Sequence, residues 1–342
     1  MLHSESLILR SFQSVKTAQK MVLRNSNCFG LALYHTADFE SDFIGIRKYL
    51  QVIIMIKKYM KKISEKAYLK DLEKIDFSKS DSGVKKVKDV SYINDNSIEH
   101  KLDIHYKSND ALKPVMINIH GGGFIGGYKE TDSLFANYLA QSGFVVFNLN
   151  YRLAYPTFNV FDQIEDVSNA VKWIISNAEK YEGDINEMYL AGQSAGGVLA
   201  VAESLLCNDK KMRADYKIED RNYKYKGIIL DCGAMHFYEN SLAYWGMRNM
   251  IFPKGYKRTD KYKFLIFENS DKISTLPKTV LLTNEKDELR KMSYHFKKIL
   301  DNNNVDNKLF DIGSDGHIGI IFKPYTVENQ KVIGSILEYF EI

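Results

Sequence analysis

Apolar and polar residues alternate in two distinct patterns along this chain. Short, nearly continuous apolar runs, typical of strands buried on both faces, recur from residue 115 onward. They cover residues 115–120, 144–151, 188–192, 227–233, 279–285 and 307–312. Between them lie stretches with the periodicity of amphipathic helices, near 131–141, 161–180, 195–207, 288–302 and 326–340. This alternation predicts an α/β fold with a mostly parallel sheet and helices on both faces.

Two further β-like segments precede these runs. "VKDVSYI" and "IEHKLDIHY" are separated by the turn-forming residues "NDNS", so we expect an antiparallel hairpin at one edge of the sheet. With this hairpin the predicted sheet has about eight strands.

The segment 234–276 interrupts the alternation of strands and helices. It is rich in aromatic residues and too long for a simple crossover between strands. We interpret it as an insertion over the strand ends, where open α/β sheets place their ligand crevice. Its aromatic residues Phe237, Tyr238, Tyr244 and Trp245 either line an apolar substrate pocket or form the core of the insertion itself. Phe124, outside the insertion, is a further candidate pocket residue.

The first 80 residues have a different character, with many lysines and no proline. Between 46 and 67 apolar residues recur in steps of three and four, which predicts a helix with one apolar face: Ile46, Leu50, Ile53, Ile56, Met60, Ile63 and Ala67. Lysines flank this face. The helix is compatible with packing on the main domain or with peripheral contact to a membrane surface. The turn-rich "SKSDSG", residues 78–83, separates this region from a second domain at 85–342.

Composition narrows the class of protein. The net charge of +4 on 342 residues gives no support for nucleic-acid binding. The longest apolar run near the start, "VIIMI", is far below the roughly 18 residues of a membrane span, and no secretory signal is evident. Cys28, Cys207 and Cys232 are widely spaced, so we interpret them as buried free thiols in a reducing compartment, with the cytoplasm as the expected location.

The sequence "GQSAGG", residues 192–197, joins a predicted strand to a predicted helix. Small flanking residues permit a sharp, strained turn that presents the hydroxyl of Ser194 at a helix N-terminus. A serine hydroxyl is a weak nucleophile and needs an adjacent base. The hexapeptide is therefore either an ordinary turn or a nucleophile, and the choice depends on partners elsewhere in the chain.

A glycine-rich loop supplies one of those partners. "HGGGF", residues 120–124, directly follows the predicted strand 115–120, and consecutive glycines cost conformational entropy. This cost is explained if the glycines allow their backbone N–H groups, unshielded by side chains, to approach a ligand oxygen. We take Gly122, Gly123 and Ala195 as candidate oxyanion donors. His120 more simply orients the loop by hydrogen bonding than acts as a base.

A base and an acid should follow the nucleophile in the chain. His317, in the loop "GSDGHIG" after the last strand, is the preferred base, because His295 lies inside a predicted helix. Asp287, just after the strand 279–285, is the preferred acid. Glu285 and Glu288 are neighbours in sequence that remain alternatives, as does Asp315 more remotely. The acid would hold the imidazole in the correct tautomer.

"YRLA", at residues 151–154, ends another buried run, and Glu165 and Asp166 follow at the next helix. We interpret Arg152 and these carboxylates as a structural ion pair beneath the site. In combination, "HGGGF", "YRLA", "ED", "GQSAGG", "DEL" and a late "GH" resemble the hormone-sensitive-lipase-like branch of the α/β-hydrolases over residues 85–342. "YRLAYP" and "DEL" depart from the usual "YRLAPE" and "DPL" of that family.

The resemblance implies an α/β-hydrolase fold with a helical cap, formed by the N-terminal helices and the insertion 234–276. It also implies a carboxylesterase without cofactor or metal, whose nucleophile, acid and base are Ser194, Asp287 and His317. The expected substrates are esters of small or medium acyl chains. An amidase, arylformamidase or peptidase with the same triad stays open, as do a membrane-surface lipase, a binding protein on a hydrolase scaffold, and a homodimer.

Overall fold

The structure is a computed structural model. It describes residues 51–342 without 52–54, 56–57, 60, 67, 71, 74, 77, 79–82, 220–222, 237–241 and 314–315, and the side chains of 242–245 are likewise not described. The chain divides into two compact units, 1–62 and 63–342. In the first unit, the described residues are helical. The second unit contains the sheet and every predicted site residue that the structure describes.

Eight strands form one sheet in the order β1-β2-β4-β3-β5-β6-β7-β8. The strands are β1 (Lys85–Ser91), β2 (Lys101–Tyr106), β3 (Lys113–Ile119), β4 (Val145–Leu149), β5 (Gly183–Gln193), β6 (Tyr225–Asp231), β7 (Lys278–Thr283) and β8 (Asn307–Asp311). β2 is antiparallel to both β1 and β4, and all other pairs are parallel. The predicted sheet and its leading hairpin are therefore confirmed. The second hairpin strand begins at Lys101 instead of residue 98, because Ile98–His100 form a 3₁₀ turn that Ser97 caps.

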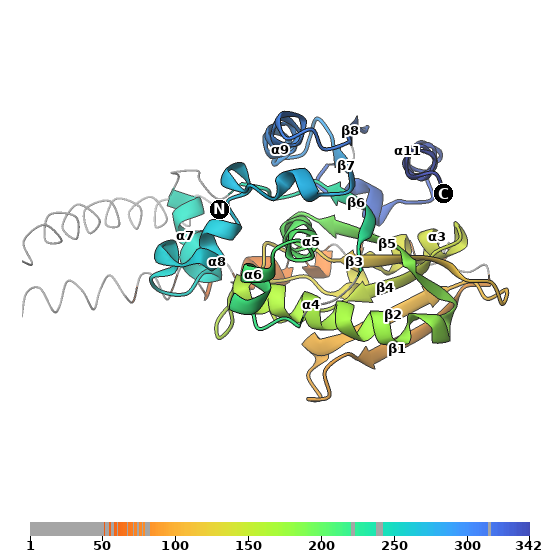
Figure 1. Cartoon of the computed structure of the whole chain (residues 1–342), viewed down its shortest axis with the longest axis horizontal. Coiled ribbons are helices and arrows are strands. Elements are labelled where there is room, and N and C mark those ends of the chain that lie inside the picture. The colour runs from red at the N-terminus through yellow and green to blue at the C-terminus, as the bar shows by residue number, and fades with distance from the viewer. Residues whose placement is uncertain are drawn as a thin grey trace, which may run out of the picture. The chain divides into compact units, whose positions relative to one another are not determined.

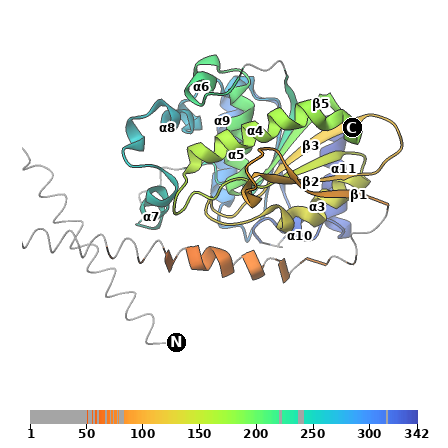
Figure 2. The same cartoon turned by 90° about the horizontal axis from the view of Figure 1, so that it is seen from below.

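Helices alternate with the strands as the periodicity predicted. The larger ones are α3 (Ser133–Gln141), α4 (Val160–Asn177), α5 (Ala195–Leu206), α9 (Arg290–Asn302) and α11 (Val327–Phe340). The short α6 (Lys210–Asp215) and α10 (Gly319–Phe322) were not anticipated. Figure 2 shows α4 and α5 on one side of the sheet and α3 and α10 on the other. Among the described residues, none of the helices combines the length and the apolar character needed to cross a membrane.

The core lies where alternate strand residues meet these helices. On the α3 side, Met116, Val146 and Tyr189 pack with residues of α3, α10 and α11 in one continuous apolar cluster. Buried parallel strands expose neither face to water, which explains why their sequences read as unbroken apolar runs. The carboxyl ends of β3, β5, β6 and β7 consequently meet at one edge of the sheet.

The helical residues that precede β1 test the predicted apolar face at one position only. Ile63 is 49% exposed, whereas the other six predicted positions lie outside the described residues. The inward positions are instead Ser64, Tyr68 and Leu72, which are four residues apart and half-buried. The ring of Tyr68 meets that of Tyr128 edge-on at 5.1 Å. A small serine at position 64 also permits close approach, because its hydroxyl lies only 2.0 Å from where a side chain on Gly126 would begin.

The insertion between β6 and β7 contains α7 (Leu242–Ile251), α8 (Asp260–Phe264) and the 3₁₀ turns Tyr256–Arg258, Phe267–Asn269 and Ile273–Thr275. α7 and α8 lie beyond the same end of the sheet in both views (Figures 1 and 2). Phe252 stacks on Tyr256 at 4.6 Å and meets Tyr262 edge-on at 5.1 Å. These described aromatic side chains thus form a core of the insertion's own, and Phe252 also contacts Phe161 of α4 at 5.7 Å.

Candidate active site

Ser194 occupies the junction between β5 and α5 with a strained backbone. Its φ of 51° and ψ of −112° lie outside the regions that a non-glycine residue ordinarily adopts. Such strain persists only where the surroundings hold it in place. Here the N–H of Ser194 donates to the carbonyl of Asp231 at 2.9 Å, and its carbonyl accepts from Ala234 at 2.9 Å. The turn after β6 therefore holds the Ser194 backbone from both sides, and the side chain is 8% exposed.

The glycines around Ser194 are required by close backbone packing. A Cβ on Gly196 would lie 2.1 Å from the carbonyl oxygen of Ile119, and one on Gly192 would lie 2.4 Å from the Gly196 oxygen. Only glycine lets α5 begin this close to the end of β3. The same packing brings the first turn of α5 beside the loop that follows β3, where the three consecutive glycines lie.

That loop has positive φ angles at Gly122 (114°) and Gly123 (61°). Gly126 donates its N–H to the carbonyl of Gly122 at 3.0 Å, and a Cβ on Gly122 would fall 2.0 Å from the oxygen of Gly126. The loop is therefore a tight turn that only glycine fits at position 122. Both Gly122 and Gly123 are exposed, and within the described part of the chain their N–H groups donate to no hydrogen bond that the structure resolves.

His120, which begins this loop, is fully buried. Its ring stacks on that of Tyr151 at 4.2 Å, and Nδ1 lies 2.6 Å from the carbonyl oxygen of Gly121. The Tyr151 hydroxyl in turn donates to the His120 carbonyl at 2.7 Å. Burial lowers the pKa of His120 to about 4, so its ring is neutral near pH 7. Its contacts fit the orienting role that the sequence suggested.

His317 contacts the carboxylate that the sequence favoured. Nδ1 of His317 lies 2.8 Å from Oδ1 of Asp287, and the imidazole is 37% exposed. The two alternatives, Glu285 and Glu288, are exposed, and Asp315 lies outside the described residues. His295 lies on α9, as expected. An imidazole held at Nδ1 by a buried carboxylate keeps Nε2 available for a proton.

Asp287 is held by more than the histidine. Oδ1 also accepts from the N–H of Leu289 at 2.9 Å, and Oδ2 accepts from the Thr283 hydroxyl at 3.0 Å. Burial opposes ionisation of Asp287, but the hydrogen bonds from His317 and Leu289 outweigh it and lower its pKa. The carboxylate is therefore charged at neutral pH and fixed in position.

The turn after β6 links the serine and histidine sides of the site, which the sequence did not reveal. Sγ of Cys232 accepts from the N–H of Ile318 at 3.4 Å, directly beside His317. Asp231 is buried, its Oδ2 has no hydrogen-bond partner within the described residues, and burial raises its pKa to about 7. The only sequence signal was the pair "DC" ending an apolar run. Cys232 is free and buried, as predicted, whereas Cys207 is free but only half-buried; Cys28 lies outside the described residues.

The predicted ion pair is present below the loop 151–154. Nη2 of Arg152 lies 2.6 Å from Oδ1 of Asp166, and Nε lies 2.8 Å from Oδ2, so the contact is bidentate. Glu165 is more distant, at 3.9 Å. Asp166 also accepts from the Arg152 N–H at 2.9 Å. The pair connects the segment 151–154, which follows β4, to α4 and thereby holds that segment in place.

The predicted substrate-binding residues are only partly described. Phe237 and Tyr238 lie outside the described residues, and the side chains of Tyr244 and Trp245 on α7 are not described. Phe124 has a φ of 68° and a side chain that is 1% exposed. Its carbonyl accepts from the amide of Gln163 at 2.7 Å. Phe124 therefore helps to fix the glycine loop, and its contact with a ligand stays a prediction.

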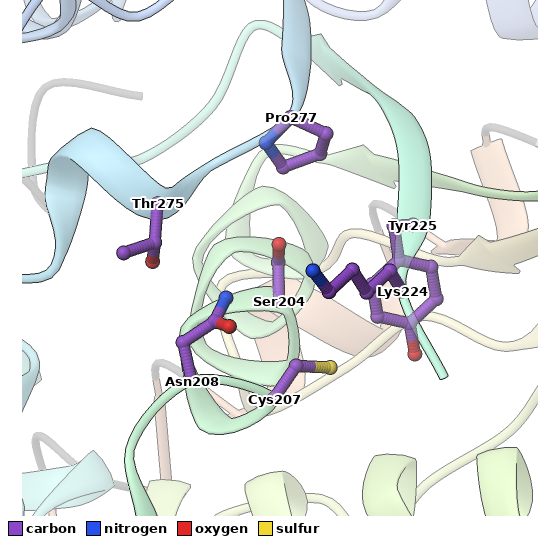
Figure 3. Close-up of a pocket in the computed structure, with 7 residues that line it drawn as sticks. All are labelled: Ser204, Cys207, Asn208, Lys224, Tyr225, Thr275 and Pro277. Atoms are coloured by element: carbon purple, nitrogen blue, oxygen red, sulfur yellow. The ribbon is translucent and has the colours of Figure 1, made fainter. Parts of the chain in front are cut away.

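A separate pocket lies at the other end of α5 (Figure 3). It is lined by Ser204, Cys207, Asn208, Lys224, Tyr225, Thr275 and Pro277. Ser204 is ten residues after Ser194, so the helix separates the two by about 15 Å. Tyr225 begins β6 and Pro277 precedes β7, so this pocket opens at the amino ends of the strands. It is distinct from the edge where Ser194, Asp287 and His317 lie.

Comparison with known proteins shows similarity to esterases. Residues 102–249 match the BD-FAE family model. The chain is 35% identical over 117 residues to isoprenylcysteine alpha-carbonyl methylesterase of Arabidopsis thaliana, covering 34% of this chain and 27% of that protein. It is 27% identical over 246 residues to an arylesterase of Saccharolobus solfataricus, covering 68% and 76%.

The chain thus spans about a quarter of the length of the first curated relatives it matches. Among solved structures, esterase B from Lactobacillus Rhamnosis superposes with a TM-score of 0.75 at 19% identity, covering 84% of this chain and 96% of that one. This similarity establishes a common fold. The chain therefore has the α/β-hydrolase fold, and the BD-FAE match and the esterase relatives are similar to it over part of its length.

Proposed function

We propose that this protein is a serine hydrolase that cleaves carboxylic esters of small or medium acyl chains. One observation carries the proposal: the hydrogen bond of 2.8 Å between Nδ1 of His317 and the buried Asp287, at the same edge of the sheet as the strained Ser194. The Asp231–Cys232 turn contacts both sides of this arrangement. The relatives named above, a methylesterase and an arylesterase, favour ester bonds over amide bonds.

In the proposed mechanism, Nε2 of His317 accepts the proton of the Ser194 hydroxyl while the serine oxygen attacks the ester carbonyl carbon. The new oxyanion is stabilised by the N–H groups of Gly122, Gly123 and Ala195. They need no reorganisation, because the tight turn holds the two glycines and the start of α5 holds Ala195. Asp287 stabilises the imidazolium as it forms.

The tetrahedral intermediate collapses when the C–O bond to the alcohol breaks and His317 gives its proton to the leaving oxygen. Water then attacks the acyl-enzyme, with His317 accepting its proton, and the second collapse releases the acid and restores Ser194. This chemistry needs neither a cofactor nor a metal. The free thiols Cys207 and Cys232 are consistent with a reducing compartment such as the cytoplasm.

The test compares Ser194, which precedes α5, with Ser204 near the other end of that helix. p-Nitrophenyl acetate, butyrate and longer esters are hydrolysed by the wild-type protein, by Ser194→Ala and by Ser204→Ala. Loss of the nucleophile should reduce kcat by roughly 10⁴-fold to 10⁶-fold. Ser204 lines the separate pocket at the other end of α5, so its variant should stay within a few-fold of wild type.

A fluorophosphonate probe should label the wild-type protein and Ser204→Ala but not Ser194→Ala. Equal turnover by Ser194→Ala and wild type would refute the proposal. Faster cleavage of matched amides than of esters would replace the esterase by an amidase and leave the triad intact.

A further inference from the structure

A second cluster of histidine and carboxylate groups lies outside the proposed triad. His236 follows β6 by five residues, Glu268 lies in the 3₁₀ turn Phe267–Asn269 of the insertion, and His295 lies on α9. Three segments that are far apart in the sequence therefore meet at one point. The proposed hydrolysis uses none of these three side chains, so ester cleavage does not account for their convergence.

The donor atoms of the cluster converge on a small volume. Oε1 of Glu268 lies 2.6 Å from Nδ1 of His236 and 3.3 Å from Nε2 of His295. The two imidazole rings are 5.2 Å apart. One donor atom from each of the three residues lies within 4.8 Å of the other two. The side chains are 25%, 20% and 46% exposed, so an ion can reach them from solvent.

Two imidazoles and one carboxylate form a recognised donor set for zinc, which binds nitrogen and oxygen at about 2.0–2.2 Å in tetrahedral geometry. Ligand atoms at these distances are about 3.3 Å apart around the metal. The contact between His295 and Glu268 already has this spacing. The contact between His236 and Glu268 is a hydrogen bond, and it would open by less than about 1 Å to admit the ion.

We propose that His236, Glu268 and His295 bind one zinc ion, or a similar divalent transition metal, with a fourth position open to water. The ion would tie the turn Phe267–Asn269 of the insertion to α9 and to the start of the insertion directly after β6. That segment is anchored two residues earlier, where Ala234 donates to the carbonyl of Ser194. Metal binding at this point would therefore stabilise the insertion where it adjoins the proposed nucleophile. The site does not depend on the proposed ester hydrolysis.

The experiment titrates the full-length, metal-free protein with zinc sulfate in a calorimeter, and with Co²⁺ while visible absorption reports tetrahedral coordination. Wild type is expected to bind one equivalent in the micromolar range or tighter and to unfold at a higher temperature when loaded. His236→Ala and His295→Ala should each weaken binding by at least about 100-fold, since losing even an outer partner of a metal ligand costs about 10-fold to 100-fold.

Two further variants distinguish zinc binding at this cluster from zinc binding elsewhere in the protein. His317→Ala is the matched control, because Cys232, Asp287 and His317 form the other cluster of three potential ligands among the described residues; it should bind zinc as wild type does. His295→Cys, checked for folding by circular dichroism, should restore binding through its thiolate. The proposal is overturned if wild type binds no zinc in this range. It is also overturned if His317→Ala abolishes binding while His295→Ala and His295→Gln leave it unchanged.

Discussion

Two histidines at the same edge of the sheet have opposite environments. His120 is fully buried, stacked on Tyr151, and its pKa is lowered to about 4 by burial. His317 is 37% exposed and hydrogen-bonded through Nδ1 to Asp287. Both follow or precede glycine-rich sequences, so the residue type and its immediate neighbours do not distinguish them.

The difference shows what each environment permits. A ring sealed in the core cannot exchange protons with a substrate, but it can hold a backbone loop in one conformation. A ring that is anchored at one nitrogen and accessible at the other can both accept and return a proton. We therefore assign a structural role to His120 and a chemical role to His317, and four sets of substitutions can break or sharpen that assignment.

The largest effect is expected from exchanging each histidine for asparagine. His317→Asn should lower kcat for p-nitrophenyl butyrate by roughly 10⁴-fold to 10⁶-fold, with little change in stability, because only the proton acceptor is lost. His120→Asn should lose about 1–3 kcal/mol of stability through its buried ring, with a much smaller effect on kcat. Urea unfolding and ester hydrolysis measure the two effects. Equal kinetic losses in both variants would contradict the assignment.

The next effect concerns the glycine loop that His120 orients. Gly122→Ala would place a Cβ 2.0 Å from the oxygen of Gly126, so the turn must open and move the proposed oxyanion donors. We expect a loss of about 10²-fold to 10³-fold in kcat, the range for removal of one donor. Gly123→Ala is the control. Its Cβ would meet no atom within 4 Å, and the φ of 61° costs only about 1–2 kcal/mol.

A loss of activity in the Gly123→Ala variant as large as in Gly122→Ala would show that loop strain, and not the close approach at residue 122, controls the rate. Circular dichroism spectra of both variants should match wild type. The two glycines are adjacent but differ in φ, 114° against 61°, and in the space around them, so the pair compares a blocked position with an open one.

A smaller effect is expected from Asp231, the buried acid whose backbone carbonyl accepts from the N–H of Ser194. Burial raises the pKa of Asp231 to about 7 from 3.8, so the folded state holds its proton between about pH 4 and pH 7 while the unfolded state loses it. Wild-type stability therefore falls across this window because of Asp231. Asp231→Asn cannot ionise, so its stability relative to wild type should rise from pH 4 to pH 7, by on the order of 3 kcal/mol, and then level off. Urea unfolding at pH 4, 6 and 8 tests this; a difference independent of pH would argue against it.

The smallest effect is expected from the tyrosine that supports His120. Tyr151→Phe removes the hydroxyl that donates to the buried His120 carbonyl at 2.7 Å. An unsatisfied buried carbonyl costs about 1–2 kcal/mol, and the ring stacking is retained. Thermal unfolding should report this loss while kcat changes less than about tenfold. A kinetic loss comparable to that of His317→Asn would mean that catalysis depends on the support of the loop as strongly as on the base itself.

Most of the sheet could be predicted from the sequence because buried parallel strands must be apolar throughout. The runs around Met116, Val146 and Leu190 each became a strand, and the periodic segments between them became α3, α4 and α5. The predicted apolar face of the first helix was wrong at Ile63, its one residue that the structure describes. Ile63 is exposed because the helix packs through other residues. Ser64 lies close to Gly126, and the ring of Tyr68 meets that of Tyr128 edge-on.

The sequence by itself determined the order of the proposed chemistry: "HGGG", then "GQSAGG", then Asp287 and His317. Only the tertiary structure decided which groups touch. In the folded chain His317 forms a hydrogen bond with Asp287, whereas Glu285 and Glu288 are exposed. The fold also buries Asp231 next to Ser194. It brings three further side chains together: His236, Glu268 and His295. The physical reason is that local patterns depend on neighbours within a few residues, whereas contacts between distant loops depend on how the sheet places their ends.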